Sequence, residues 1–183
     1  AGCDVETLTR RAGVNRHSLY GAFSGKAGLF RAALEHYVAH VTAPYLAILE
    51  GGAGLDDLAR YFDAMAGDAR ASDPEGKGGY DRRGCLVTNS IAELGDSDAG
   101  IAAIIAAYHA RVERAFADLV RRGQAGGSIR AGLDPAAIAR WLRMTTQGIS
   151  VAARFGQAVP DLAGVVRAAL GPDTPLLQGE EAR

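Results

Sequence analysis

Apolar side chains recur at intervals of three and four residues along most of this chain, which is the spacing of one face of an α-helix. The longest such run begins near Ile101 and continues to Val120. No stretch alternates apolar and polar residues for long enough to indicate a β-strand. The pattern therefore predicts an all-α fold.

Proline, glycine and capping residues indicate where these helices begin and end. Pro44 would clash with the backbone carbonyl of His40, so we expect a kink or two abutting helices there. Asp134 followed by Pro135 predicts the start of a helix that runs to about residue 155. Asp161 caps a last helix whose inner residues are expected to be Leu162, Val165, Val166, Ala169 and Leu170. Residues 72–83 contain three glycines and one proline, which favours a loop.

The stretch from Val5 to Phe30 predicts a short helix, a turn at Gly13 and a second short helix, with Leu19 and Phe23 on its inner face. The outward side of the second helix carries five side chains that can hydrogen-bond a phosphate or a base edge: Asn15, Arg16, His17, Ser18 and Tyr20. An ordinary helical corner is the alternative. Residues 1–40 carry a net charge of +2 and the remainder −3, which is the asymmetry expected of a DNA-binding segment.

The segment AGVNRHSLYGAFSGKAGLF, residues 12–30, resembles the DNA-binding signature of the TetR family of bacterial transcription regulators. The segment RGCLVTNS, residues 83–90, resembles the ligand-sensing half of one branch of that family. The resemblance implies that Arg16, His17 and Ser18 face the major groove, and that Asn15, Tyr20 and Lys26 hold the phosphate backbone.

Two departures from the family pattern affect these expectations. Gly21 and Ala22 stand where relatives commonly have an aromatic residue and a histidine, so we expect one phosphate contact fewer. Family domains also begin with a helix that packs over the helix-turn-helix, and we expect this first helix to be missing from the 183 residues.

The chain is thus expected to comprise a helix-turn-helix DNA-binding domain over residues 1–42, a helical effector-binding and dimerisation domain over 43–171, and a flexible tail over 172–183. We predict a ligand-responsive repressor that releases a palindromic operator when a small molecule binds its second domain. The alternative is a helical ligand- or partner-binding dimer that has lost DNA binding. Gly21, Ala22 and the overall charge of −1 keep that alternative open.

Candidate effector contacts are polar, aromatic or sulfur-containing residues and a valine on the inner helix faces, namely Phe62, Met65, Cys85, Asn89, Tyr108, Val112, Met144 and Gln147. For each of them, plain core packing is the alternative. The helix from Pro135 carries a second apolar stripe, which favours pairing with a twofold mate. The predicted interface residues are Trp141, Gly148, Val151, Phe155, Leu162 and Val166.

Cys85 and His109 would suit a thiol nucleophile and its base, but no further catalytic motif accompanies them, so we do not expect an enzyme. Cys85 as an oxidation sensor is a minor alternative. The spacing of cysteine and histidine matches no metal site, and we expect neither a metal nor a cofactor. No apolar run is long enough to span a bilayer, and the first residues lack the basic-then-apolar order of a signal peptide, so a cytoplasmic protein is expected.

Overall fold

The computed structural model describes residues 5–71, 84–155, 157 and 161–172. Within these ranges the chain forms α-helices and one short π-helix and contains no strand, which confirms the predicted all-α fold. No described helix combines the length and the apolar character needed to cross a membrane. The predicted loop over 72–83 and nearly all of the predicted tail lie outside the described residues.

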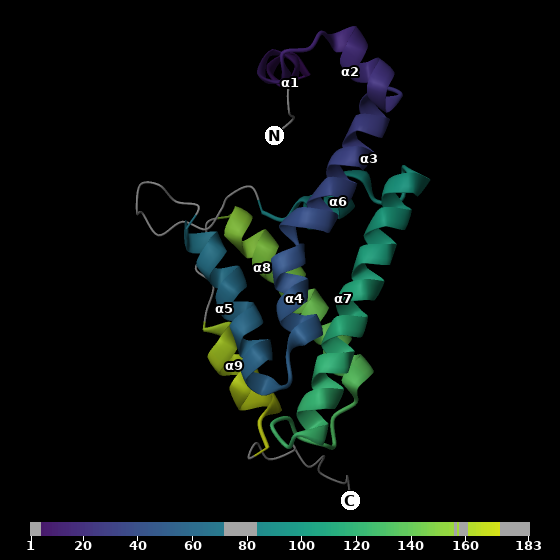
Figure 1. The fold of residues 1–183 in the computed structure, drawn as a ribbon. Helices are drawn as coiled ribbons and strands as arrows, with labels where there is room; N and C mark the ends of the chain where they lie inside the picture. Colours follow the sequence, from purple (N-terminus) through teal and green to yellow (C-terminus); the bar gives the residue numbers. More distant parts are fainter. Residues whose placement is uncertain (1–4, 72–83, 156, 158–160, 173–183) are drawn as a thin grey trace, which may run out of the picture.

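The first two helices project from one end of the molecule, and the third leads from them back to a helical bundle (Figure 1). Helix α1 (Val5–Ala12) and helix α2 (Arg16–Phe23) are joined by a turn in which Gly13 has a φ of +66°. Helix α2 ends at Ser24, which adopts the left-handed conformation, and α3 (Lys26–His36) follows at once. The predicted helix, turn and helix are confirmed.

Pro44 lies where the chain passes from α3 into the helical bundle. Helix α3 continues into a π-helix, η1 (Tyr37–Val41), and α4 (Ala43–Gly51) begins with Pro44 in its first turn. The Thr42 backbone N–H reaches back to the Tyr37 carbonyl at 3.2 Å, closing the wider π-type turn. Of the two predicted arrangements, the chain adopts abutting helices, because proline is tolerated in the first turn of a helix but not in its interior.

The main core lies between α4, α5 (Leu55–Ala71), α7 (Ala99–Ala125), α8 (Pro135–Arg154) and α9 (Leu162–Leu170). Three aromatic rings form its centre: Tyr61 meets Phe62 and Phe116 edge-on, with ring centroids 5.3 and 5.1 Å apart. Such edge-to-face pairs are a preferred arrangement of aromatic rings. The core therefore joins the predicted amphipathic helices along their apolar faces.

A second, smaller core attaches α3 to the bundle. Leu34 of α3 is fully buried against α6 (Leu86–Leu94) and the beginning of α7, where Val87 and Ile101 are its buried neighbours. The Arg31 guanidinium holds the Asp98 carboxylate through two hydrogen bonds, from Nε at 3.2 Å and from Nη2 at 3.0 Å. The same carboxylate caps α7 by accepting the Gly100 and Ile101 backbone N–H groups. Helix α3 is therefore packed and ion-paired to the body it leads into.

The capping aspartates predicted for the last two helices are confirmed. Asp134 accepts hydrogen bonds from the first turn of α8, and Asp161 accepts one from the Gly164 N–H at 2.8 Å. One predicted inner residue of α9 is wrong: Val165 is 50% exposed, whereas its neighbour Val166 is 1% exposed. Adjacent helical residues point about 100° apart, so only one of the two valines faces the core.

Candidate DNA interface and effector cavity

Helix α2 presents the side chains predicted to face DNA. Arg16, His17 and Ser18 are all exposed in its first turn, and Lys26 is exposed at the start of α3. The Asn15 side-chain oxygen caps α2 by accepting the Ser18 backbone N–H at 2.7 Å. That oxygen thus fixes the helix start, and only the amide N–H₂ of Asn15 is left for a phosphate.

Tyr20 lies half-buried one turn after Arg16, and the Arg16 guanidinium lies 5.3 Å from the centre of its ring. This cation–π contact holds both side chains on the outer face of α2. The predicted inner face of α2 is more exposed to solvent than expected. Phe23 is 38% exposed, and Val14 in the preceding turn is 41% exposed. Phe23 therefore lies at the edge of the packed face and not inside it.

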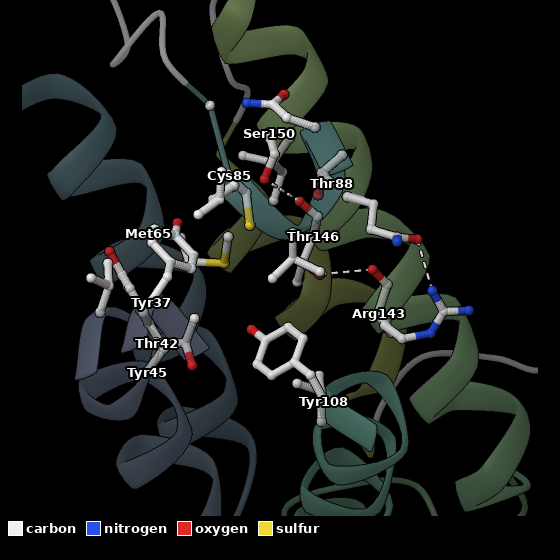
Figure 2. A pocket seen from close by; sticks show the side chains of 18 of the residues that line it. Tyr37, Thr42, Tyr45, Met65, Cys85, Thr88, Tyr108, Arg143, Thr146 and Ser150 are labelled. Atoms are coloured by element: carbon white, nitrogen blue, oxygen red, sulfur yellow. Dashed lines mark hydrogen bonds between the residues drawn. The ribbon is translucent and has the colours of Figure 1, made fainter. Parts of the chain in front are cut away.

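A cavity of about 730 Å³ lies in the second part of the chain, bounded by η1, α4, α5, α6, α7 and α8. Figure 2 shows Tyr37, Thr42, Tyr45 and Met65 on one side, Thr146, Arg143 and Ser150 on the other, and Tyr108 between them. Its volume falls in the range of small-molecule sites. Six of the predicted effector contacts line it, namely Met65, Cys85, Asn89, Tyr108, Val112 and Gln147.

The other two predicted contacts lie elsewhere. Phe62 is buried in the main core beside Phe116, with ring centroids 6.5 Å apart. Met144 is 61% exposed on the outer face of α8. Each lies three positions from a residue that does line the cavity, Met65 or Gln147. Side chains three positions apart in a helix point about 60° away from each other, which is enough to move one of them off the cavity wall.

Sequence reasoning missed most of the hydroxyl groups in this wall, which belong to Tyr37, Thr42, Tyr45, Tyr61, Thr146 and Ser150. Burial raises the pKa of Tyr108 to about 12, with the neighbouring Cys85 thiol as the next cause. Burial likewise raises the pKa of Tyr37 and of Tyr61 above the ordinary value. These phenols are therefore uncharged at neutral pH.

One end of the cavity holds a chain of polar contacts. Glu113 accepts a hydrogen bond from Arg143 Nε at 2.6 Å, and Arg143 Nη1 donates to Gln147 Oε1 at 2.7 Å. The Gln147 amide nitrogen then faces His109 Nε2 at 3.3 Å, so that ring nitrogen accepts the hydrogen bond. Burial and, second, Arg143 lower the pKa of His109, whereas Glu113 opposes them. The imidazole is therefore neutral at this end.

Two predicted cavity residues have other partners as well. The Asn89 side-chain oxygen accepts a hydrogen bond from Arg154 Nη1 at 2.7 Å. Cys85 lies beside Tyr37, and it shares the cavity wall with His109, whose Nε2 is bonded to Gln147. Cys85 and His109 thus both line the cavity, and the ring nitrogen of His109 that could accept a proton is bonded to Gln147.

The outer face of α8 forms an exposed apolar surface. Its large side chains are Trp141, Met144, Val151 and Phe155, exposed by 39, 61, 46 and 73%. Gly148 is also exposed and lies on this face of α8. We call these five residues of α8 the α8 stripe. Of the predicted interface residues on α9, Leu162 is half-buried and Val166 is covered by its own chain, whereas the neighbouring Val165 is 50% exposed.

Comparison with known proteins identifies the family. Residues 77–169 match the family described as tetracyclin repressor-like, C-terminal domain. The chain is also 31% identical over 157 residues to the HTH-type transcriptional repressor ComR of Escherichia coli K12, across 85% of this chain and 71% of ComR. The chain belongs to the TetR family. The resemblance found in residues 12–30 and 83–90 is thereby confirmed.

Solved structures of other proteins superpose on this TetR-family chain. The reduced form of E. coli NemR superposes with a TM-score of 0.75 over 95% of this chain and 89% of that chain, at 19% identity, which supports the fold alone. A cysteine mutant of the TetR family regulator CifR, solved with 26-bp double-strand operator DNA, superposes with a TM-score of 0.70 at 29% identity, over 92% of this chain and 85% of that one. The roles of individual residues in this TetR-family chain stay predictions.

Proposed function

We propose that this TetR-family chain is a homodimeric, ligand-responsive repressor that releases a palindromic operator when a small molecule fills the cavity. The observation that carries this proposal is one continuous helical segment. It begins at Lys26, beside the exposed face of α2, and reaches Tyr37, which lines the cavity. At about 1.5 Å per residue, this segment spans roughly 17 Å, so an event in the cavity lies one helix away from DNA.

On the DNA side, Arg16 is proposed to pair with a guanine and His17 to donate to a purine, with Ser18 beside them. Tyr20 and Lys26 are proposed to contact phosphates, together with the amide N–H₂ of Asn15. CifR bound to operator DNA supports a DNA-reading role for this fold. We place the domain boundary between residues 42 and 43, where η1 gives way to α4.

A dimer is proposed to form through the α8 stripe. An apolar surface of this extent on one helix face is typical of a protein interface, and Gly148 in its middle allows two helices to approach closely. Two recognition helices about 34 Å apart would then read adjacent major-groove turns of a palindrome. The proposal also places the protein in the cytoplasm, where operator DNA lies.

Effector control is proposed to act through a two-state equilibrium. A ligand that favours one arrangement of α3 shifts the spacing of the two recognition helices. Converting nearly all of a DNA-competent population requires about 10⁴-fold tighter binding to the released state. Catalysis is not proposed, because His109 Nε2 takes the Gln147 N–H and so does not act as a base toward Cys85.

Fluorescence anisotropy with labelled DNA from the region flanking the coding sequence tests the DNA-binding part. We expect the protein to bind one fragment far more tightly than random DNA of equal length, and Arg16→Ala to remove that preference. Binding of all fragments alike, or of none, would favour the alternative of a helical dimer that has lost DNA reading. Sedimentation of the same sample reports whether that dimer exists.

A further inference from the structure

Helix α2 carries an arginine whose guanidinium is held by an aromatic ring and not by a carboxylate. This helix lies at the end of the molecule that projects from the bundle (Figure 1), and the guanidinium carbon of Arg16 lies 5.3 Å from the centre of the Tyr20 ring. By contrast, Arg31 and Arg111 each donate two N–H groups to a carboxylate. Arg16 makes no hydrogen bond and no ion pair with any residue that the structure describes, so the Tyr20 ring is what orients it.

The contact between Arg16 and Tyr20 follows from local helix geometry. The two residues stand four positions apart in α2, and side chains at that spacing lie on one face of a helix. A helical side chain also leans toward the N-terminus of its helix, so the Tyr20 ring reaches back to the first turn, where Arg16 lies. The backbone beneath the ring is fixed as well, since the Tyr20 carbonyl accepts the Gly25 N–H at 2.8 Å. Tyr20 is therefore a firm support for the guanidinium.

Helix stability does not account for an arginine at position 16. Arg16 is the first residue of α2, and a cation there opposes the positive end of the helix dipole. No acidic residue stands between Glu6 and Glu35 in the sequence, so this segment offers no carboxylate of its own to the guanidinium. The Arg16 side chain is also exposed. An exposed cation kept at the unfavourable end of a helix indicates a partner outside the chain.

A ring and a carboxylate hold a guanidinium in different ways. The N–H groups of arginine all lie in the plane of the guanidinium, and a carboxylate occupies some of them. An aromatic ring attracts the cation through its face and accepts none of these protons in a hydrogen bond. The edge of Arg16 that would pair with guanine O6 and N7 thus keeps its donors. The Tyr20 ring therefore restricts the direction of Arg16 without using its hydrogen-bonding capacity.

We propose that Tyr20 is a positioning residue for base reading, whose ring holds Arg16 in the orientation that pairs with guanine while its hydroxyl contacts a phosphate. This inference rests on the proposed function, because it needs Arg16 to read a base. Ordering Arg16 before DNA arrives lowers the entropy cost of the bidentate pair, whereas an unsupported arginine turns to a phosphate of any sequence. A cation–π contact at an exposed site is worth a factor of about two to five in an equilibrium constant, and we assign this share of base discrimination to the ring.

Two substitutions of Tyr20 separate the role of its ring from that of its hydroxyl. Fragments that the unsubstituted protein selects from random DNA define the site, and the guanine preference that Arg16→Ala abolishes marks the position that Arg16 reads. Fluorescence anisotropy then gives the ratio of affinities for guanine and for each other base at that position. Tyr20→Leu should lower this ratio about two- to fivefold, because the ring is lost. Tyr20→Phe should keep the ratio and weaken binding to all sequences alike, because only the hydroxyl is lost.

Lys26→Ala is the matched control, because it removes a proposed phosphate contact outside the ring and should leave the ratio unchanged. A ratio that survives Tyr20→Leu, or that falls as far in Tyr20→Phe as in Tyr20→Leu, would refute the positioning role alone. The same holds if Arg16→Ala leaves every base preference intact. An unsubstituted protein that selects no sequence would refute the repressor role and the positioning role together.

The contact itself is measurable without DNA. In NMR spectra of the free protein, the Tyr20 ring should shift the δ-methylene protons of Arg16 upfield of those of Arg11, which is exposed on α1. Tyr20→Phe should keep this shift and Tyr20→Leu should abolish it, with circular dichroism to verify the helix content of both variants. Equal shifts for Arg16 and Arg11 in the unsubstituted protein would overturn the proposal even if Tyr20→Leu does not fold.

Discussion

Replacing Val151 by arginine tests whether the α8 stripe holds two subunits together. Val151 is 46% exposed at the middle of the stripe, between Gly148 and Phe155. An arginine here extends from an already solvent-facing position, so the monomer should fold as before. In a twofold dimer, however, both subunits carry the substitution, so two like charges lie in one apolar interface.

The size of the effect follows from the exposure of the stripe. Full burial of a large apolar side chain contributes about 1.5–3 kcal/mol, so a half-exposed one contributes about 1 kcal/mol when a partner covers it. Four such side chains on two subunits supply on the order of 8 kcal/mol before the association cost of about 4–15 kcal/mol. Burying two arginines costs several kcal/mol more, so a loss of at least about 4 kcal/mol, a thousandfold in the dissociation constant, is expected.

Sedimentation velocity at micromolar concentration measures the outcome, with circular dichroism to verify helix content. The matched control is Val14→Arg, because Val14 is 41% exposed but lies in the turn before α2, remote from α8 in the fold (Figure 1). We expect a monomer for Val151→Arg and a dimer for the control. A Val151→Arg protein that sediments with the unchanged chain as a dimer would refute the assignment of this stripe.

Three further results are expected. Arg16→Ala should cost about 1–3 kcal/mol of operator binding and relax one base position, whereas Lys26→Ala should weaken all sequences alike and reduce the salt slope by about one unit; filter binding at several salt concentrations separates them. Because the pKa of His109 lies below 6.5 in the folded chain, its share of stability is complete above pH 6.5 and declines as the pH falls from there toward the lowered pKa; urea unfolding should show a flatter pH profile for His109→Gln, and identical profiles would contradict the neutral imidazole. Leu34→Ala should lower the free energy of unfolding by about 2–5 kcal/mol, because it leaves a void in the second core; urea unfolding measures the loss, and an unchanged free energy would count against the packing of α3 on α6.

Helix limits and caps were predictable because they depend on neighbours in sequence. Asp134 and Asp161 accept hydrogen bonds from residues two or three positions ahead, and such local contacts are visible in a sequence. Pro44 likewise marked a break between helices that was visible in the sequence. The sequence did not decide, however, between a kink and two abutting helices. The choice between them depends on how α3 and α4 pack against α7, which no local pattern records.

The cavity was harder to predict because a cavity wall and a solid core use the same helix faces. Phe62 and Met65 share one amphipathic pattern, yet only Met65 reaches the cavity. Tyr61 escaped notice altogether, since its ring packs on Phe116, more than fifty residues later in the chain. Val165 and Val166 illustrate the remaining error: in a helix as short as α9, periodicity does not fix which of two adjacent valines faces inward.

The proposed coupling between cavity and DNA rests on one residue pair that closes the second core. Leu34 on α3 is fully buried against Val87 on α6, and the residues just before Val87 line the cavity. A ligand that displaces the start of α6 must therefore either open a void at Leu34 or move α3 with it. Voids in close-packed interiors are costly, so α3 follows. Because Arg31 also ties α3 to Asp98 at the start of α7, the proposed movement would turn α3 about that attachment and carry α2 with it.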